Sequence, residues 1–400
     1  MMAIGPVVGF ALCLGAIYLL AWLTTDLCYW SRLVVWRGAT YDDFTSKFAA
    51  RAIANAGPPL QLGAAAAPPP TFAEIAYLRI SDRSEHTAAT ADLLARSQTR
   101  ALVALKDRRI VYESYGPGVG RDSMASSFSI AKSALSALIG VAIGEGAIGG
   151  LDDPMIRYLP ELAARPGAER VRIRHLLSMT SGLRYRGGGM GGGPFGDDAR
   201  AYYAPDLRRL ALKKAWPEVE PGSRWQYNNF NPMLLGLILE RAVGQSVSTY
   251  LSERLWKAIG AEAPASWSLD SRRSGFEKME SGLNARAVDF LNFGLLFLEG
   301  GARDGRQIVP RAWVEASTRH DPVVAGPSTS PPGQEWARMR DYGYLWWLDP
   351  KAPGRYFGMG NLGQVLYVAP DRNAVLARFG ASFADIDWVG ALRGLATKLS

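Results

Sequence analysis

One apolar stretch constrains the fold of this chain more than any other. Residues 129–144, SIAKSALSALIGVAIG, carry a single charge, at Lys132. The remaining side chains leave almost no polar face, and several glycines follow the stretch. A helix that is apolar all round is buried in the centre of a protein. The stretch therefore predicts a central helix that ends at the glycines and holds a lysine inside the core.

Ser129 and Lys132 are spaced i and i+3, so they share one face of this helix, with the serine in its first turn. Burial disfavours the charged form of a lysine and lowers its pKa by up to several units. Such a lysine is a free amine near neutral pH and can take the proton of a serine hydroxyl. The helix N-terminus offers N–H groups to an oxyanion forming beside the serine. Ser129 is thus a candidate nucleophile and Lys132 its candidate base.

A second candidate group is Tyr227-x-Asn229, where the loop SRWQYNN enters an apolar helix. A phenol can relay a proton between nucleophile, base and leaving group, and an amide can hold the lysine or the substrate. The alternative is a packed tyrosine followed by a helix cap from Asn229 or Asn231. A Ser-His-Asp triad is disfavoured, because the chain has three histidines and no G-x-S-x-G motif. His175 lies among Leu and Met residues and is expected to be a packed structural residue.

The N-terminal run 4–23 is uncharged throughout, and its twenty residues are about the length that spans a bilayer core. Trp22, Tyr29 and Trp30 are suited to the membrane interface. The run predicts a retained N-terminal transmembrane helix. A cleaved signal peptide stays open as the alternative, although no Lys or Arg precedes the run and no A-x-A site follows it.

Cysteine usage and charge exclude several function classes. Cys13 and Cys28 lie within or just after the uncharged run, which leaves the body without a disulfide framework, a cysteine nucleophile or a zinc cluster. The net charge of +8 comes from scattered basic residues, a pattern typical of a solvated surface and not of a nucleic-acid site. We expect no metal, no organic cofactor and no nucleic-acid partner, and the sequence leaves the oligomeric state open.

The chain divides into residues 1–30 as a membrane anchor, 31–70 as a juxtamembrane segment with a Pro/Ala linker, and 71–400 as the folded domain. Within the domain the patterns predict hairpins at 100–118 and 364–380, and helices at 172–183, 231–256, 286–301 and 388–400. Strands at both ends with helices between them predict an α+β fold. We expect an antiparallel sheet flanked by helices, with an all-helical region, preceded by the transmembrane helix.

Seven motifs stand in a fixed order along the chain: SFSIAKS, LDDPMIRYLPEL, IRHLLSMTSGL, WQYNNFNPMLLGLILERAVG, GLNARAVDFLNFGLLFLEGG, YGYLWWL and GNLGQVLYVAPDRNAVLARFG. Their order and spacing resemble the serine β-lactamase-like hydrolases. This penicillin-recognising group includes class C β-lactamases, esterases, D-amino-acid peptidases and 6-aminohexanoate-dimer hydrolases. YGYLWWL followed by GNLGQ is most similar to the 6-aminohexanoate-dimer hydrolase and esterase branch. The resemblance covers roughly residues 74–400 and implies a β-lactamase/transpeptidase-like fold.

By this resemblance Ser129 is the acylated nucleophile, Lys132 its base partner and Tyr227 the third catalytic group. Asn229 is implied as a supporting residue. The backbone N–H of Asn361 is implied to pair with that of the nucleophile as an oxyanion hole.

The family's third motif is Lys or His, then any residue, then Gly, and it aligns with Gly358-Met359-Gly360. The position of the cation is therefore a glycine. In the family that cation helps to hold a substrate carboxylate. Its loss argues against turnover of carboxylate-bearing β-lactams and leaves acyl transfer on simple esters or amides open.

These patterns together predict a membrane-anchored serine hydrolase that cleaves a small-molecule amide or ester. We expect it at a bacterial inner membrane with the catalytic domain in the periplasm, although Arg32, Arg37 and Lys47 after the run oppose export by the positive-inside rule. The alternative is a non-catalytic, membrane-tethered binding or sensor module built on the same fold.

Overall fold

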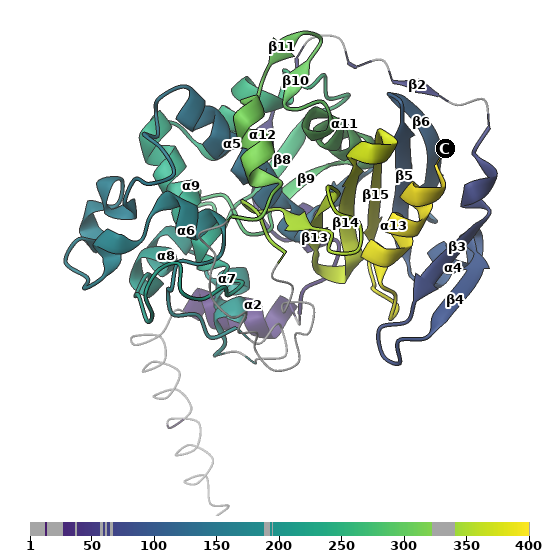
Figure 1. Cartoon of the computed structure of the whole chain (residues 1–400). Helices are drawn as coiled ribbons and strands as arrows, with labels where there is room; N and C mark the ends of the chain where they lie inside the picture. The colour runs from purple at the N-terminus through teal and green to yellow at the C-terminus, as the bar shows by residue number, and fades with distance from the viewer. Residues whose placement is uncertain are drawn as a thin grey trace, which may run out of the picture.

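The computed structural model describes residues 13, 27–36, 38–56, 59–60, 62–64, 67–187, 193, 195–321 and 341–399. Strands from both ends of the described chain meet in one seven-stranded sheet (Figure 1). In spatial order they are β12 (Trp347–Leu348), β13 (Tyr356–Gly360), β14 (Gln364–Ala369), β15 (Ala374–Gly380), β5 (Thr99–Lys106), β6 (Arg109–Tyr115) and β2 (Gly63–Ala64). Neighbouring strands pair antiparallel except β2 and β6, which are parallel.

Both predicted hairpins form the centre of this sheet. β5 and β6 are joined by Asp107 and Arg108, whose φ angles are 49° and 60°. Positive φ at both central residues is the geometry of the two-residue turn that matches the twist of a hairpin. β14 and β15 are joined through Asn373, which is also left-handed. β5 then pairs with β15, so the two ends of the domain close one sheet, as the sequence predicts.

Two helices cover opposite faces of the sheet. A Cβ on Gly294 of α11 (Ala287–Leu298) would stand 2.5 Å from Cγ1 of Val375, so this helix packs closely on β15. From the other side, the ring of Trp388 in α13 (Trp388–Lys398) lies 4.3 Å from the guanidinium carbon of Arg378. Side chains alternate between the two faces along a strand, and residues 375 and 378 are an odd number apart.

A helical region stands beside the sheet (Figure 1). It contains α5 (Ala131–Gly144), α6 (Ile173–Leu177), α7 (Asp197–Tyr203), α8 (Leu207–Lys214), α9 (Phe230–Val243), α10 (Val247–Leu251), η7 (Ser252–Trp256) and α12 (Arg311–Ser317). α5 and α9 contact each other, and nearly all their side chains are buried. The apolar stretch at 129–144 is thus the central helix that the sequence predicts.

The helix predicted at 172–183 is shorter than expected, because α6 ends at Leu177. The hydroxyl of Ser178 donates to the carbonyl oxygen of Arg174 and lies 2.8 Å from it, and Thr180 Oγ1 lies 2.7 Å from the same hydroxyl. Met179 between them has φ 60°. Local hydroxyl bonds compete with helix continuation, and a left-handed residue ends it.

Three smaller sheets complete the described fold. One has the order β1 (Ala50–Ile53), β8 (Ala265–Ser268), β9 (Leu283–Arg286) and β7 (Met124–Ser126), and another pairs β3 (Glu74–Leu78) with β4 (Glu85–Ala89), which leads into α4 (Thr90–Arg96). A short hairpin joins β10 (Ala302–Arg303) to β11 (Arg306–Gln307).

The described part of 31–70, predicted as a juxtamembrane segment and linker, packs on the body. α2 (Leu27–Trp36) and α3 (Asp43–Ser46) precede β1, and Phe44 is fully buried. The boundary at residue 71 stays a prediction. The transmembrane helix predicted at 4–23 lies outside the described residues apart from Cys13. Within the part of the chain that the structure describes, we find no helix with the length and apolar character to cross a bilayer.

Candidate active site

Ser129 sits on a strained turn between a strand and a helix. β7 leads into the 3-10 turn η2 (Phe128–Ile130), which continues as α5. Phe128 has φ 46°, a conformation that costs a non-glycine residue about 1–3 kcal/mol. Its ring is buried edge-on against Phe44, with centroids 5.1 Å apart, so the packing holds the turn. The turn leaves Ser129 half-buried between two buried neighbours.

Lys132 is 1% exposed, and its Nζ lies 2.9 Å from Oγ of Ser129. The same nitrogen donates to the carbonyl oxygen of Glu280 at 2.6 Å. Burial lowers the pKa of Lys132 from 10.5 to about 7, against the opposing pull of the Glu280 and Asp198 carboxylates. A large fraction of this side chain is therefore a free amine near neutral pH, next to a hydroxyl proton that it can accept.

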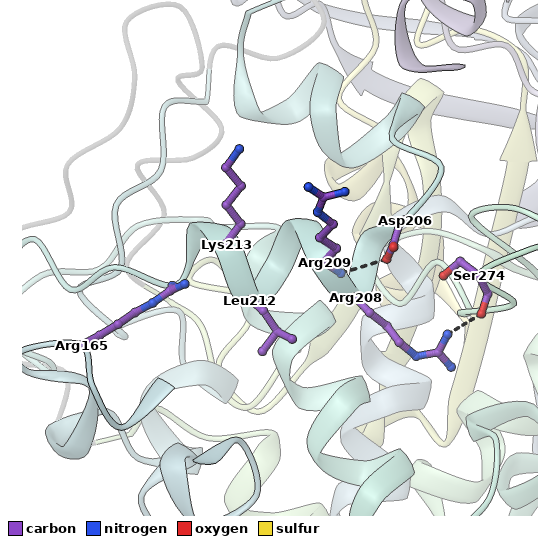
Figure 2. A pocket seen from close by; sticks show the side chains of 7 residues that line it. All are labelled: Arg165, Asp206, Arg208, Arg209, Leu212, Lys213 and Ser274. Atoms are coloured by element: carbon purple, nitrogen blue, oxygen red, sulfur yellow. Dashed lines mark hydrogen bonds between the residues drawn. The ribbon is translucent and has the colours of Figure 1, made fainter. Parts of the chain in front are cut away.

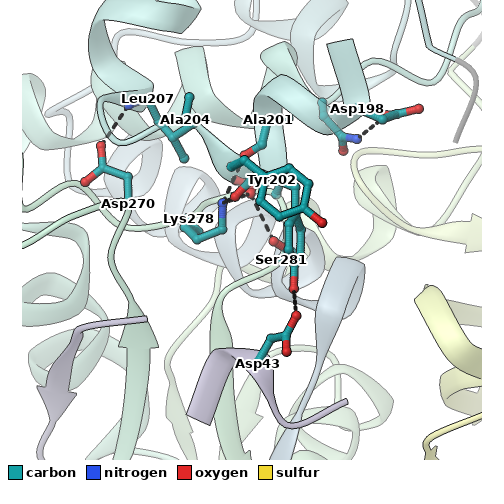
Figure 3. Close-up of polar contacts among 12 residues, drawn as sticks. Asp43, Asp198, Ala201, Tyr202, Ala204, Leu207, Asp270, Lys278 and Ser281 are labelled. Atoms are coloured by element: carbon teal, nitrogen blue, oxygen red, sulfur yellow. Dashed lines mark hydrogen bonds and ion pairs between the residues drawn. The ribbon is translucent and has the colours of Figure 1, made fainter. Parts of the chain in front are cut away.

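A buried ion pair holds the segment that binds Lys132. Nζ of Lys278 lies 2.8 Å from Oε1 of Glu280, and both side chains are almost completely buried. Lys278 also donates to the carbonyl oxygens of Ala201 and Tyr202, at 2.9 and 3.2 Å (Figure 3). The pair fixes the segment whose backbone carbonyl holds Lys132. Sequence reasoning missed both residues.

Tyr227 completes the predicted trio. Its ring stacks on Trp347, with centroids 5.8 Å apart and 15° between the planes, and Nζ of Lys132 lies 5.0 Å from its centroid. Burial raises the pKa of the phenol above 10, while a hydrogen bond with the Ser129 side chain opposes the rise. The phenol is therefore protonated at neutral pH and in contact with the serine. The structure brings Ser129, Lys132 and Tyr227 together.

Asn229 directs its amide away from the lysine. Its Nδ2 donates to the phenol oxygen of Tyr185 and to the carboxylate of Asp198, both at 3.1 Å. Tyr185 also hydrogen-bonds Asp198. Sequence reasoning missed Tyr185 and Asp198, because they flank a glycine-rich run whose conformation no periodicity sets. The signal available was the acidic pair that begins α7.

Gly360 ends β13 directly against the Ser129 turn. A Cβ at this position would stand 3.1 Å from the backbone nitrogen of Ser129, 2.9 Å from Cβ of Phe128 and 2.5 Å from the carbonyl oxygen of Ser127. Asn361 begins the next turn, η9 (Asn361–Gly363), in which Leu362 is left-handed with φ 60°. The side chain of Gln364 donates to the carbonyl oxygen of Asn361 at 2.8 Å. A strained turn, clamped by Gln364, thus follows directly after the glycine that packs against Ser129.

Position 358 faces the turn η2 and the start of α5. A Cβ on Gly358 would lie 3.3 Å from Cγ2 of Ile130 and 3.3 Å from Oγ of Ser133. These two side chains occupy the space that a larger residue at 358 would need. The site thus lacks the cation of the third motif, and the side chains of Ile130 and Ser133 fill the space next to position 358.

A separate pocket of about 650 Å³ lies beside α8 (Figure 2). It is lined by Arg165, Asp206, Arg208, Arg209, Leu212, Lys213 and Ser274. Arg208 is paired with Glu240 at 2.6 Å and donates to the carbonyl oxygen of Ser274. The lining offers no activated nucleophile. Among the described residues, no group of three or more His, Cys, Asp or Glu side chains is placed to hold a metal ion.

Comparison with known proteins agrees with this geometry. The model of the beta-lactamase family matches residues 88–385. The chain belongs to the beta-lactamase family. The match spans the strained serine turn, the central helix, the tyrosine loop and β13, so the resemblance inferred from the motifs is confirmed at the level of the family.

Several hydrolases of this family are similar to the chain. The 6-aminohexanoate-dimer hydrolase of Paenarthrobacter ureafaciens is 26% identical over 326 residues, which cover 76% of this chain and 78% of that protein. A Bacillus anthracis structure, provisionally named a 6-aminohexanoate-dimer hydrolase, is 23% identical with a TM-score of 0.71 and covers 94% of both chains. EstCE1, a hydrolase with promiscuous acyltransferase activity, is 17% identical with a TM-score of 0.59, covering 77% of this chain and 94% of its own. The predicted β-lactamase/transpeptidase-like α+β fold and the hydrolase class are confirmed.

Proposed function

We propose that this chain cleaves an ester or amide bond through an acyl-enzyme on Ser129. The neutral amine of Lys132 takes the hydroxyl proton as Oγ attacks the substrate carbonyl carbon. Tyr227, in contact with Oγ, gives its phenol proton to the leaving group when the tetrahedral intermediate collapses, and the proton taken by Lys132 restores the phenol. Water then hydrolyses the acyl-enzyme by the reverse proton path. The observation that carries the proposal is the 2.9 Å contact between Ser129 and a lysine whose pKa burial lowers to about 7.

The oxyanion is held by backbone N–H groups in this proposal. The N–H of Ser129 and that of Asn361 face the carbonyl oxygen of the substrate, as N–H donors do in acyl transfer. Gly360 supports the assignment, because its missing side chain lets β13 approach the backbone of Ser129. Asn229 supports the site from the loop of Tyr227, through its bond to Asp198.

The charges around the centre favour neutral substrates. Position 358 carries no cation, and the carboxylates of Glu280 and Asp198 act electrostatically on Lys132. A substrate carboxylate placed here finds no cation at position 358 and meets the carboxylates of Asp198 and Glu280, of which Glu280 is paired with Lys278. Neutral esters and simple amides are therefore the substrate class, and β-lactams are poor substrates. Faster hydrolysis of nitrocefin than of a neutral p-nitrophenyl ester would contradict this assignment.

The location is part of the same proposal. The uncharged run 4–23 anchors the protein in a bacterial inner membrane, with the catalytic domain in the periplasm. The assignment is supported by the length of the run and by its lack of charge. Membrane fractionation of the full chain, followed by protease protection in spheroplasts, tests both the anchor and its orientation.

An active-site probe tests the chemistry. A fluorophosphonate adds its mass to the peptide that contains Ser129, and Ser129→Ala abolishes the labelling. Ser133→Ala is the matched control, since Ser133 lies one helical turn further along α5 with its hydroxyl bonded to the carbonyl oxygen of Leu345 at 2.9 Å. Labelling that survives Ser129→Ala contradicts the assignment. Complete absence of labelling and turnover favours the alternative, a non-catalytic binding module.

A further inference from the structure

α2 begins at Leu27, close behind the uncharged run that ends at Leu23. Four peptide links join these two residues, so the chain between them reaches at most about 14 Å. The helix therefore stays near the point where the chain leaves the bilayer, if the run is the anchor described under the proposed function.

The inner face of α2 is fixed to the body. Tyr29 is buried and lies edge-on to Tyr203 of α7, with ring centroids 6.3 Å apart. Arg32 donates to the carbonyl oxygens of Tyr203 and Ala204, at 3.2 and 3.4 Å, at the C-terminal end of α7. The guanidinium also lies 5.1 Å from the ring centroid of Trp36. α2 is thus a docked element of the domain, and its only charged side chain is used against the body.

The outer face of α2 carries no charge. Its exposed residues are Cys28, Ser31, Val34 and Val35. Val34 is 68% and Val35 72% exposed. Phe195, 69% exposed, extends this face through an edge contact with Trp30 at 5.5 Å.

A helix that faces water normally carries charged or polar residues on its outer side. The outer face of α2 has two exposed valines, a cysteine and one polar residue, Ser31, whose hydroxyl donates to the carbonyl oxygen of Cys28 at 3.0 Å. Three of the six large hydrophobic side chains that are exposed among the described residues, namely Val34, Val35 and Phe195, gather at this one helix. Clustered exposed apolar side chains mark an interaction site, whereas single ones need no explanation.

We propose that the α2 surface, defined as Cys28, Ser31, Val34, Val35 and Phe195, rests in the interfacial layer of the bilayer that the run 4–23 enters. Interfacial helices bury their apolar face about 5–10 Å into the boundary of headgroups and acyl chains. The short connection to the run keeps the helix within reach of that layer. The net charge of +8 favours an anionic lipid surface. This inference rests on the membrane anchor of the proposed function.

The contact has a consequence for the catalytic domain. Tyr29 and Phe128 belong to one buried cluster, and ring contacts connect them through Tyr203, Tyr202 and Phe44. A bilayer contact through α2 therefore fixes the height and tilt of the Ser129 turn above the membrane. The domain is held against the lipid surface and does not swing on its tether.

Fluorescence quenching in vesicles tests the surface on the full chain. Val34→Cys or Val35→Cys, in a Cys13→Ser, Cys28→Ser background, is labelled with an environment-sensitive dye and reconstituted in phosphatidylethanolamine/phosphatidylglycerol vesicles containing a spin-labelled lipid. The matched control carries the dye at Arg306→Cys on the exposed β10–β11 hairpin, at the far end of the molecule from α2 in Figure 1. We expect a blue shift and severalfold stronger quenching at 34 and 35 than at 306.

The outcomes separate the two proposals. A chain that does not float with the vesicles refutes the anchor. A chain that floats but shows equal quenching at 34, 35 and 306 refutes the α2 surface alone, and energy transfer between labelled chains in detergent assigns that surface to a second copy. The variant Val34→Asp, Val35→Asp should still float and hydrolyse a soluble ester at the wild-type rate, while a dye at Ser31→Cys loses its quenching.

Discussion

Lys132 reaches Ser129 from inside the protein: its side chain is 1% exposed, yet its Nζ lies 2.9 Å from the hydroxyl of a half-buried serine. This hydrogen bond therefore connects a buried amine to a partly exposed hydroxyl. Desolvation makes the lysine a base, and this contact gives the base a proton to accept.

The pH profile should report this lysine. kcat/KM for a neutral ester should rise with pH and reach half its maximum near pH 7, because burial lowers the pKa of Lys132 to about 7 and only the free amine accepts the proton. Lys132→Arg stays protonated and should be inactive throughout. A profile that is flat between pH 5 and 9 contradicts the role of the lysine.

The lowered pKa of Lys132 helps catalysis but should make the folded protein less stable near neutral pH. The unfolded lysine binds its proton below pH 10.5 and the folded one only below about pH 7, so the native state loses stability as pH falls between these values. Lys132→Met removes the effect. We expect it to be inactive but more stable than wild type at pH 7, with the difference in Tm shrinking toward pH 10.

Removal of either partner in the relay should abolish most activity. Lys132→Ala and Tyr227→Phe should each lower kcat by about 10²–10⁴, the usual worth of positioned proton transfer. The double variant should be little worse than either single one, because both act on one proton path. Tyr342→Phe is the control, since Tyr342 is buried edge-on against Tyr227, with ring centroids 6.4 Å apart, and has no part in the proposed relay. Losses below tenfold in both single variants place the relay elsewhere.

The sequence predicts the centre of the site because its key pair is local. Ser129 and Lys132 are three residues apart on an apolar helix, so helix geometry alone brings them together. Glu280, in contrast, is 148 residues from the lysine that its carbonyl holds. Its segment FEKMESG shows no periodicity, and only the tertiary packing reveals that Lys278 and Glu280 form a buried pair.

The sequence predicts a helix or strand correctly where a local residue pattern alone determines it. The two central hairpins are short, mostly apolar runs that carry their own turn residues, and they form as expected. Residues 172–183 do not form one helix, because hydroxyl hydrogen bonds at Ser178 and Thr180 compete with helix continuation. The spacing of apolar residues carries no signal of these bonds. The packing of Phe44 against Phe128 depends on a long-range contact that local sequence does not specify.

Neutralising Glu280 should move the pH profile. The Glu280 carboxylate raises the pKa of Lys132 against the effect of burial. Glu280→Gln removes that charge and leaves Lys278 as an additional buried cation, and both changes lower the pKa of Lys132. The rising limb of kcat/KM should therefore shift to lower pH. The distant control Glu299→Gln, in an exposed pair with Arg108, should leave the midpoint unchanged.

Two glycines on β13 offer a matched steric test. Gly360→Ala places a Cβ against the backbone of the nucleophile's turn, which cannot yield without moving Ser129. We expect loss of fluorophosphonate labelling and a lower Tm. Gly358→Ala meets only the side chains of Ile130 and Ser133, at 3.3 Å, and should keep most activity.

The same geometry bears on restoring the family's cation. Gly358→Lys needs more room than the packed Ile130 and Ser133 leave, so we expect a lower Tm and no gain in nitrocefin hydrolysis. A stable Gly358→Lys variant with raised nitrocefin turnover would contradict this packing argument, because the lysine would then reach the site past Ile130 and Ser133.

The clamp on the Asn361 turn should matter for kcat more than for substrate binding. The amide of Gln364 donates to the carbonyl oxygens of Asn361 and Gly380, at 2.8 and 2.7 Å, and so holds Leu362 in its left-handed conformation. Gln364→Leu should lower kcat and the rate of fluorophosphonate labelling together, with KM little changed, because the displaced N–H serves the oxyanion.

Rescue by glycine separates this positioning role from simple destabilisation. Leu362→Gly removes the cost of a left-handed backbone at that residue, so the turn needs less of the clamp. Adding Leu362→Gly to Gln364→Leu should restore part of kcat, whereas Leu345→Gly, at another left-handed leucine outside the turn, should not. If the double variant recovers Tm but not kcat, or if Gln364→Leu alone keeps full kcat, the turn does not present the oxyanion donor.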